Sequence, residues 1–549
     1  MVTLSLCIIV KNEEKNLPAC LENIKEAVDE IIVVDTGSTD NTVEVAKRLG
    51  AKVYHFQWCD HFAKARNESL KHATCDYILW LDADDRMKKE DVKKLIELKK
   101  FLNPQDKYAF YFQLVNEYKD GRQDRCFQIR MFPNSDQIRF KGRIHETVMA
   151  DLKRLKIESK FLEPVIRIFH MGYREKNRSK LERNLKLLLK ALEEAPEEHI
   201  YYYYLGMTYS GLGESEKAKE YLKKLLRSEK IKHGLSPVYI AGGIELANLF
   251  IKENNFDHAL EIVDGLYKNF PQADVIKLLK GNLLLKLDKP QEAISMYMLT
   301  DPKKLTLLIV PVMEDVLQKG YYLNLGKAYE KLGYLNLARN AYEKALDETN
   351  TDARAYFYLG QLAIRTLHFQ EAIHYFQKAL RFKINKQQCS RVYTLLGVAY
   401  QELNDQAKAQ ACFQKAVEQD HTNIRAKIHL AEILFDRGEI EETKRILKEI
   451  TPSVNGYTLR IKTLLSAVYA QELKLEKCVE IADDILKMLK QPRNYILNDI
   501  KDLIYIYAHI EQCLNEDPSF YREKLNIHKT ISVLNILQQY TEQMGNKAD

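Results

Sequence analysis

Apolar and polar positions alternate in blocks along the first third of the chain. Four apolar runs, each ending in polar residues, predict strands at 4–10, 31–34, 52–56 and 77–81. Helical spacing of apolar residues separates them, with predicted helices at 17–28, 41–49 and 62–73, and Asp60 is expected to cap the third. Strands that alternate with helices across short links predict an α/β, Rossmann-like domain with a mostly parallel sheet.

Polar residues follow three of these strands where each ends. Asn12 and Glu13 come after the first, Asp35 ends the second, and Asp82, Asp84 and Asp85 follow the fourth. Ligands of such sheets bind beyond the carboxyl ends of the strands, so these side chains are expected to converge at one edge. Carboxylates there suit Mg²⁺ or Mn²⁺ with a diphosphate, and an acidic turn that caps the next helix is the alternative. No GxGxxG follows the first strand, which disfavours a nicotinamide dehydrogenase.

Two further strands, 108–115 and 125–132, are predicted as a hairpin around the turn 119–122. Another apolar run, 165–169, ends at His170. The segment between them carries Arg139, Lys141 and Arg143, which are either phosphate partners or a solvated basic face. His145 and Glu146 follow directly.

The pattern changes at residue 178. A leucine stripe predicts a connecting helix, and beyond it helical segments recur with small residues at Gly326, Gly360 and Gly397, close to a period of about 34 residues. These segments resemble tetratricopeptide repeats. About eight are predicted, with an irregular insertion near Pro302 and Pro311. Stacked repeats form a solenoid whose concave face suits an extended peptide or a protein partner.

Composition limits the remaining classes. A chain of 549 residues is too long for one core, and a net charge of +6 gives no argument for nucleic acid as a partner. Nine cysteines without a CxxC pair indicate reduced thiols. The first residues read as a strand and not as a signal peptide, and no apolar run approaches the ~20 residues of a membrane span, so a cytoplasmic protein without an integral membrane segment is expected.

The first 175 residues resemble family 2 glycosyltransferases of the GT-A fold. The stretches that carry the resemblance are SLCIIVKNEEKNLPACLENI, EIIVVDTGSTDNTVEVAKRLGA, FAKARNESL and YILWLDADD. The resemblance implies that the nucleotide-sugar is bound by Val10, Asn12, Glu13, Asp35, Arg66, Asp82, Ala83 and Asp84. It also implies that Asp82 faces the ribose or sugar, and that Asp84 and His170 bind Mn²⁺ or Mg²⁺.

An inverting sugar transfer needs a base for the acceptor proton. The resemblance makes Glu146 the first candidate, with His145 as the alternative base or a diphosphate contact. If the acceptor were a cysteine thiol, its lower pKa would weaken the need for a base.

The predicted organisation is a glycosyltransferase domain at 1–175, a connecting helix at 176–197 and a repeat solenoid at 198–545. The predicted activity is metal-dependent transfer from a nucleotide donor, with UDP as the expected nucleotide, to a peptide or protein held near the repeats. The combination is similar to bacterial enzymes that glycosylate cysteine or serine of peptides. Two alternatives stay open. One is a repeat scaffold with an inactive sugar-nucleotide domain, and the other is a transferase acting on a glycan, with the repeats forming a homodimer.

Overall fold

The computed structural model describes residues 2–103, 105, 107–118, 123–171, 178–305, 310–311, 314–346, 353–450, 458–472, 474–488 and 535. It divides into two compact units, Met1–Ala338 and Arg339–Asp549. Each unit is described by itself.

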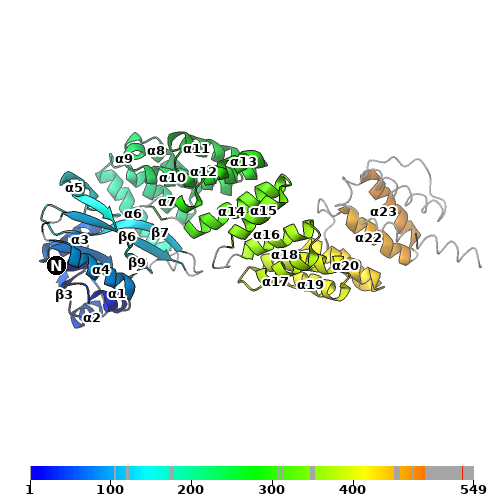
Figure 1. The fold of residues 1–549 in the computed structure, drawn as a ribbon, viewed down its shortest axis with the longest axis horizontal. Helices are drawn as coiled ribbons and strands as arrows, with labels where there is room; N and C mark the ends of the chain where they lie inside the picture. Colours follow the sequence, from blue (N-terminus) through cyan, green and yellow to red (C-terminus); the bar gives the residue numbers. More distant parts are fainter. Residues whose placement is uncertain are drawn as a thin grey trace, which may run out of the picture. The chain divides into compact units, whose positions relative to one another are not determined.

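The first unit begins with a mixed β-sheet (Figure 1). Its strands are β1 (Leu4–Val10), β2 (Glu30–Asp35), β3 (Lys52–His55), β4 (Tyr77–Asp82), β5 (Asp85–Arg86), β6 (Tyr108–Glu117), β7 (Gln123–Pro133), β8 (Glu158–Phe161) and β9 (Arg167–His170). They follow the order β3-β2-β1-β4-β7-β6-β9-β5, with β8 also paired to β6. β1 pairs in parallel with β2 and β4, and β6 with β8 and β9, whereas β4–β7, β6–β7 and β5–β9 are antiparallel. The predicted mostly parallel α/β sheet is confirmed.

Helices cover both faces of this sheet. They are α1 (Leu17–Ile24), α2 (Thr42–Arg48), α3 (Phe62–Lys71), α4 (Lys89–Phe101) and α5 (Met149–Arg154). Successive strand residues point to opposite faces, so Leu6 and Leu79 pack in one core with α1 and α4. Ile78 and Trp80 pack in the other with α3 and α5. Burial on both faces explains why the strands read as continuous apolar runs.

The rest of the first unit is helical. Its helices are α6 (Arg178–Glu194), α7 (Ile200–Leu212), α8 (Ser215–Leu226), α9 (Glu229–Gly234), α10 (Ser236–Lys252), α11 (Phe256–Asn269), α12 (Asp274–Lys286), α13 (Pro290–Met298), the 3₁₀ turn η1 (Pro302–Lys304) and α14 (Glu314–Lys331). α15 (Leu335–Lys344) begins here and crosses the unit boundary. The η1 turn lies where the irregular insertion was predicted.

The second unit continues as helix pairs. They are α16 (Ala353–Arg365) with α17 (Phe369–Ala379), α18 (Lys386–Glu402) with α19 (Gln406–Gln419), α20 (Ile424–Asp436) with α21 (Ile440–Lys448), and α22 (Thr458–Gln471) with α23 (Leu475–Met488). Gly360 and Gly397 face Phe376 and Phe413 of their partner helices, and both rings are fully buried. The small residues therefore let paired helices approach closely, as predicted. No helix among the described residues is long and apolar enough to cross a bilayer.

Of two further local predictions, one is wrong and the other falls outside the described residues. Asp60 does not cap α3: the N-cap is His61, whose ring accepts from Lys64 N at 3.4 Å, while Asp60 accepts from Trp58 and pairs with Lys190 of α6. The turn predicted at residues 119–122 lies outside the described residues, although the strands on either side of it pair as an antiparallel hairpin.

Candidate functional site

The carboxyl ends of three parallel strands meet at one edge of the sheet. Val10 is in register with Asp35, and Ile9 with Asp82, so β1, β2 and β4 end at the same level. β9 runs parallel to β6, whereas β6 is antiparallel to β7 and β9 is antiparallel to β5. This topology brings His170, at the end of β9, to Asp84 and Asp85.

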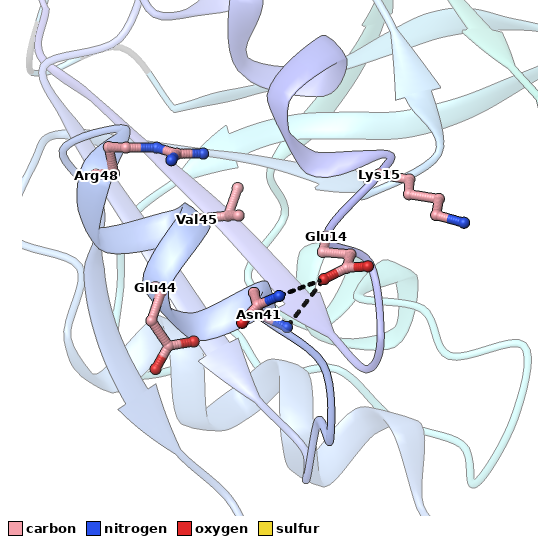
Figure 2. A pocket seen from close by; sticks show the side chains of 6 residues that line it. All are labelled: Glu14, Lys15, Asn41, Glu44, Val45 and Arg48. Atoms are coloured by element: carbon pink, nitrogen blue, oxygen red, sulfur yellow. Dashed lines mark hydrogen bonds between the residues drawn. The ribbon is translucent and has the colours of Figure 1, made fainter.

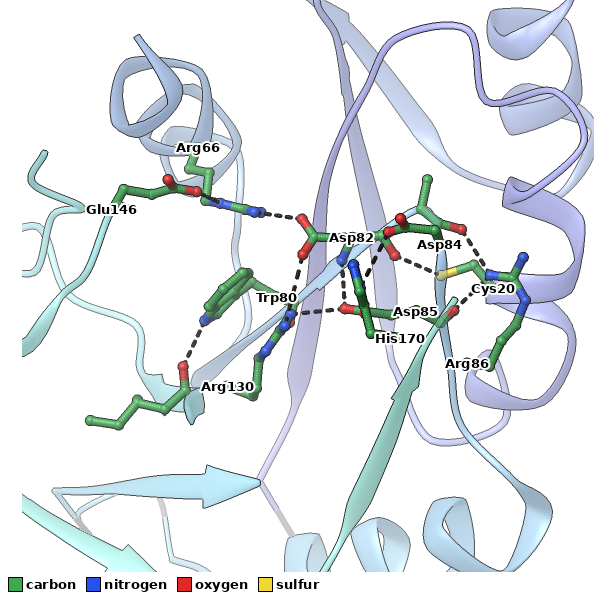
Figure 3. A network of polar contacts seen from close by, with 12 residues as sticks. Cys20, Arg66, Trp80, Asp82, Asp84, Asp85, Arg86, Arg130, Glu146 and His170 are labelled. Carbon is green, nitrogen blue, oxygen red and sulfur yellow. Dashed lines mark hydrogen bonds and ion pairs between the residues drawn. The ribbon is translucent and has the colours of Figure 1, made fainter. Parts of the chain in front are cut away.

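Four potential metal-ligating side chains cluster at this edge (Figure 3). Asp82, Asp84, Asp85 and His170 each offer a ligand atom, and these atoms lie within 4.8 Å of one another. Asp84 Oδ1 is 3.6 Å from His170 Nδ1. Two of the predicted residues, Asp84 and His170, are thus brought together from segments far apart in the sequence.

Asp85 is the most deeply buried residue of the cluster and orients its neighbours. Its side chain is fully buried, and Oδ2 accepts from Asp82 N and from Arg130 Nη1, both at 2.9 Å. Its Oδ1 is 2.8 Å from His170 Nδ1. Both oxygens are therefore occupied by the protein, and Asp85 is suited to orient His170, as carboxylates commonly do for a metal-bound histidine.

Arg66 of α3 joins the acidic cluster to the predicted base. Its Nη2 donates to Asp82 Oδ1 at 2.6 Å, and its Nε donates to Glu146 Oε1 at 2.5 Å. The guanidinium is buried, with its carbon 4.2 Å from the Trp80 ring centroid. Because Trp80 and Asp82 point to the α3 face of β4, this contact follows from the alternation of the strand. The guanidinium of Arg66 thus bridges the carboxylates of Glu146 and Asp82.

The electrostatics of the three acids differ. Burial opposes ionisation of Asp82, but Arg66 and Arg130 outweigh it and lower its pKa. Burial raises the pKa of Asp84, and the carboxylates of Asp82 and Asp85 raise it further against the opposing effect of His170. For His170, burial is outweighed by the hydrogen bond to Asp85, and its pKa is raised. The positive charges near Asp84, on His170 and Lys180, therefore do not outweigh its burial and the two neighbouring carboxylates.

These residues fit a divalent cation. Asp84 is partly exposed, whereas Asp85 is already satisfied by Arg130 and His170. A cation would relieve the crowding of carboxylates that raises the pKa of Asp84. Carboxylate oxygens suit both Mg²⁺ and Mn²⁺, and an imidazole ligand favours Mn²⁺. Asp84 and His170 would hold the metal, with Asp82 beside them.

Four of the residues predicted to bind the nucleotide lie at the ends of β1 and β2 or in the loops that follow: Val10, Asn12, Glu13 and Asp35. Asn12, at φ 57°, accepts from Thr39 N at 2.7 Å, which ties the two loops together. The buried Asp35 accepts from Ser38 N at 3.0 Å.

Burial raises the pKa of Glu13, with a smaller contribution from Asp84. The carbonyl of Val10 accepts from Thr36, and Ala83, between Asp82 and Asp84 in the sequence, is buried. Their contacts to a nucleotide remain predictions.

A shallow pocket of about 390 Å³ opens beside these loops (Figure 2). It is lined by Glu14, Lys15, Asn41, Glu44, Val45 and Arg48. Glu14 Oε2 accepts from the backbone and side-chain nitrogens of Asn41, each at 3.1 Å. None of the lining residues belongs to the acidic cluster, so the pocket lies apart from the candidate chemistry.

His145 and the three basic residues near it contact other parts of the protein, and among the described residues none of these contacts is to the acidic cluster. The His145 ring stacks on Tyr204 of α7, with centroids 3.8 Å apart. Arg139 donates to the carbonyls of Ser135 and Ile138, Lys141 pairs with Asp151, and Arg143 pairs with Glu194. The phosphate role considered for these three cations thus competes with partners that they already have.

Sequence reasoning missed Arg130 and the structural role of Asp85. Arg130 is 2% exposed and is charged within the apolar run Ile129–Phe132. A charged residue at such a position signals a buried ion pair, because an unpaired buried charge is costly. That signal is present in the sequence, but it does not identify the partner.

Comparisons with known proteins match both the sheet domain and the helical region of this chain. The model of glycosyl transferase family 2 matches residues 5–151, and tetratricopeptide-repeat models match 200–231, 320–352, 353–385 and 390–423. A TPR repeat-containing protein of Synechococcus elongatus is 32% identical over 314 residues, which cover 54% of this chain and 76% of that protein.

Two further relatives are glycosyltransferases by name. The SPbeta prophage-derived glycosyltransferase SunS of Bacillus subtilis is 28% identical over 293 residues, covering 52% of this chain and 67% of SunS. An uncharacterized glycosyltransferase of Rickettsia typhi is 35% identical over 130 residues, covering 23% and 43%. The fold, the site and these matches define a glycosyltransferase. The chain belongs to the family 2 glycosyltransferases that carry tetratricopeptide repeats.

Proposed function

We propose that this glycosyltransferase is a metal-dependent, inverting enzyme that moves a sugar from a UDP-linked donor to a side chain of a peptide or protein acceptor. The proposal rests on one arrangement: Asp82, Asp84, Asp85 and His170 form a cluster, and Arg66 links that cluster to Glu146 by pairing with both Asp82 and Glu146. It supports a donor diphosphate and an acceptor nucleophile meeting at the same edge of the sheet.

Each side chain has a distinct task in this proposal. Asp84 and His170 hold Mn²⁺ or Mg²⁺, which when bound stabilises the charge of the leaving diphosphate. Asp82, kept ionised by Arg66 and Arg130, accepts from a sugar or ribose hydroxyl. Asp35, Asn12 and Glu13 border the nucleoside, with Val10 and Ala83 forming the apolar floor.

Glu146 accepts the proton of the acceptor nucleophile. Its Oε1 is engaged by Arg66, and its Oε2 makes no hydrogen bond to the described residues. An ionised carboxylate with one oxygen turned to a guanidinium keeps the other available as a general base. His145 is the alternative base, but its ring is stacked on Tyr204 and does not touch the acidic cluster in the described residues.

The repeats are proposed to bring the acceptor. Tetratricopeptide solenoids present a concave surface to peptides and proteins, which favours a protein acceptor over a free glycan. SunS, which is named as a glycosyltransferase, is similar to this chain over 293 residues, a length greater than the predicted catalytic domain alone. Use of the repeats for a homodimer would leave the acceptor open, and light scattering of the purified protein distinguishes that arrangement.

The test is calorimetric titration of the full chain with UDP, with and without Mn²⁺. We expect Mn²⁺ to strengthen UDP binding, and Asp84→Asn to remove that gain, a loss of about 10- to 100-fold in metal-dependent affinity. Asp136→Asn, a fully exposed acid of the same domain, is the matched control and should bind as the wild type does. Equal UDP affinity with and without Mn²⁺ would contradict metal dependence, and no UDP binding in either case would contradict the UDP donor.

A further inference from the structure

The loop that carries Glu146 is closed by backbone hydrogen bonds between its two ends, and its middle residues contact other elements of the protein. Lys141 and Thr147 form an isolated antiparallel bridge, with N–O distances of 2.9 and 3.0 Å between their backbones. Between them, Gly142 is at φ 102° and His145 at φ 54°. Two left-handed residues within one short loop indicate that neighbouring structure determines its conformation, because a left-handed histidine is strained. We name residues 141–147 the base loop.

Successive residues of the base loop contact the helices that begin the repeat region. Arg143 pairs with Glu194 of α6, Ile144 is buried in the core of α6, α7 and α8, and the His145 ring lies parallel to the Tyr204 ring of α7, at an interplanar angle of 6°. The next residue, Glu146, turns back to Arg66. Three successive side chains of the loop thus contact the helices, and the fourth, Glu146, returns to the catalytic edge.

Other contacts fix α6 to the same part of the domain. Lys190 Nζ is 3.1 Å from Asp60 Oδ2, and Arg143 Nη1 donates to Asp60 O at 2.7 Å. Phe62 N, at the start of α3, donates to Arg143 O at 2.8 Å. Because α3 also carries Arg66, both partners of the Arg66–Glu146 pair are anchored beside α6 and α7.

We propose that Tyr204, although it belongs to a repeat helix, is a positioning residue that holds the base loop, and through His145 holds Glu146, against Arg66. The first repeat pair is then a wall of the catalytic site as well as part of the solenoid. This inference rests on the proposed function in so far as Glu146 is the base. The stacked ring compensates the strain of His145 and fixes the direction in which the next side chain leaves the loop.

The test compares three variants of the full chain. Tyr204→Ala removes the stack, Tyr204→Phe keeps the ring, and Tyr202→Ala is the matched control, since Tyr202 lies on the same helix and is also half-buried but stacks on His199 and not on the base loop. Circular dichroism first establishes that each variant retains its helical content and melting temperature.

The first readout is the release of UDP from UDP-sugars by hydrolysis, in which water takes the place of the acceptor nucleophile and gives the free sugar. We expect Tyr204→Ala to lower kcat by about 10- to 100-fold while the donor KM stays within about 2-fold, because the base is misplaced and the donor site is not. Tyr204→Phe should restore kcat, and Tyr202→Ala should leave it unchanged. An equal loss in Tyr204→Ala and Tyr202→Ala, or no loss in either, would overturn the inference.

The second readout does not depend on turnover. The chain has two tryptophans, and Trp58→Phe leaves Trp80, whose ring centroid lies 4.2 Å from the Arg66 guanidinium carbon, as the only tryptophan, to be excited at a wavelength that tyrosine does not absorb. In that background Tyr204→Ala should shift the emission of Trp80 and raise its quenching by acrylamide, and Tyr202→Ala should not. Unchanged emission in both overturns the positioning role, whereas a shift in a protein that turns over no UDP-sugar supports the positioning role and refutes the proposed function.

Discussion

Two buried guanidinium groups flank the same tryptophan at the centre of the site. The Arg66 and Arg130 carbons lie 4.2 and 3.9 Å from the Trp80 ring centroid, and the indole nitrogen donates to Ile129 O at 2.8 Å. The face of an indole attracts a nearby cation, so Trp80 helps to position both guanidinium groups. Each arginine can therefore direct its nitrogens to the acids: Arg66 to Asp82 and Glu146, and Arg130 to Asp85.

The Asp85–Arg130 pair should behave as a buried ion pair. Removing one partner, as in Asp85→Asn or Arg130→Met, leaves an uncompensated buried charge and is expected to lower the free energy of unfolding by about 3–5 kcal/mol. The double variant should recover part of this loss. Denaturant unfolding followed by Trp80 fluorescence in the Trp58→Phe background measures each change.

A comparison with a half-exposed pair makes this test specific. Lys141→Met breaks the contact to Asp151, where the lysine side chain is 56% exposed, and should cost at most about 1 kcal/mol. If Arg130→Met cost no more than Lys141→Met, Arg130 would not be the structural counter-charge of the site.

At this scale the sequence predicts residue types better than their partners. Asp82, Asp84 and His170 are predicted from their places after apolar runs, and the structure brings them together. That Arg66 bridges Asp82 and Glu146 is not predictable from spacing, since it depends on how α3 and the base loop meet across the sheet face. Asp85 was visible as a third acid, but only its full burial shows that it orients His170.

At the scale of elements, close helix pairs depend on glycine. A Cβ built on Gly397 of α18 would lie 2.6 Å from the Phe413 ring of α19, which is fully buried. By contrast, a Cβ on Gly265 of α11 would meet nothing within 4 Å. The two glycines therefore separate the effect of close packing from that of helix propensity.

Gly397→Ala should destabilise the protein by about 1–3 kcal/mol, because the added methyl forces the ring of Phe413 to move. Gly265→Ala should stabilise it by about 0.5–1 kcal/mol through helix propensity alone. Chemical denaturation followed by circular dichroism at the helical band gives both values. A stabilising Gly397→Ala would contradict the close approach of α18 and α19.

The elements themselves were largely predictable. The apolar runs at 4–10 and 77–81 correspond to β1 and β4, and the leucine stripe after residue 178 corresponds to α6. The cap of α3 was wrong, since neighbouring residues compete for such a position and Asp60 is drawn to Lys190 of α6. The local sequence around Asp60 does not indicate a partner that lies 130 residues away in the chain.

At the scale of the whole molecule, the boundary between the catalytic and the repeat regions is a contact surface. Ile144 lies in the core of the first repeat helices, and Phe62 packs against that core. The sequence places a change of pattern at residue 178, which marks where helices begin and not where the catalytic site ends. Repeat periodicity identifies the solenoid, but the attachment of its first helix to the base loop required the structure.

The proposed function requires this chain to be an active, metal-dependent glycosyltransferase with Glu146 as its base. The most direct measurement is UDP release from a panel of UDP-sugars with Mn²⁺, with Mg²⁺ and with chelator, for the wild type, Asp84→Asn and Glu146→Gln. Glu158→Gln, an exposed glutamate of the same domain, is the matched control.

We expect release from at least one UDP-sugar that stops with chelator and in Asp84→Asn. It should fall by about 10²- to 10⁴-fold in Glu146→Gln, because a base contributes roughly that factor, and stay unchanged in Glu158→Gln. Release that survives chelator and Asp84→Asn would contradict metal dependence, and full activity in Glu146→Gln would exclude that residue as the base. No release from any UDP-sugar would contradict the account of the donor.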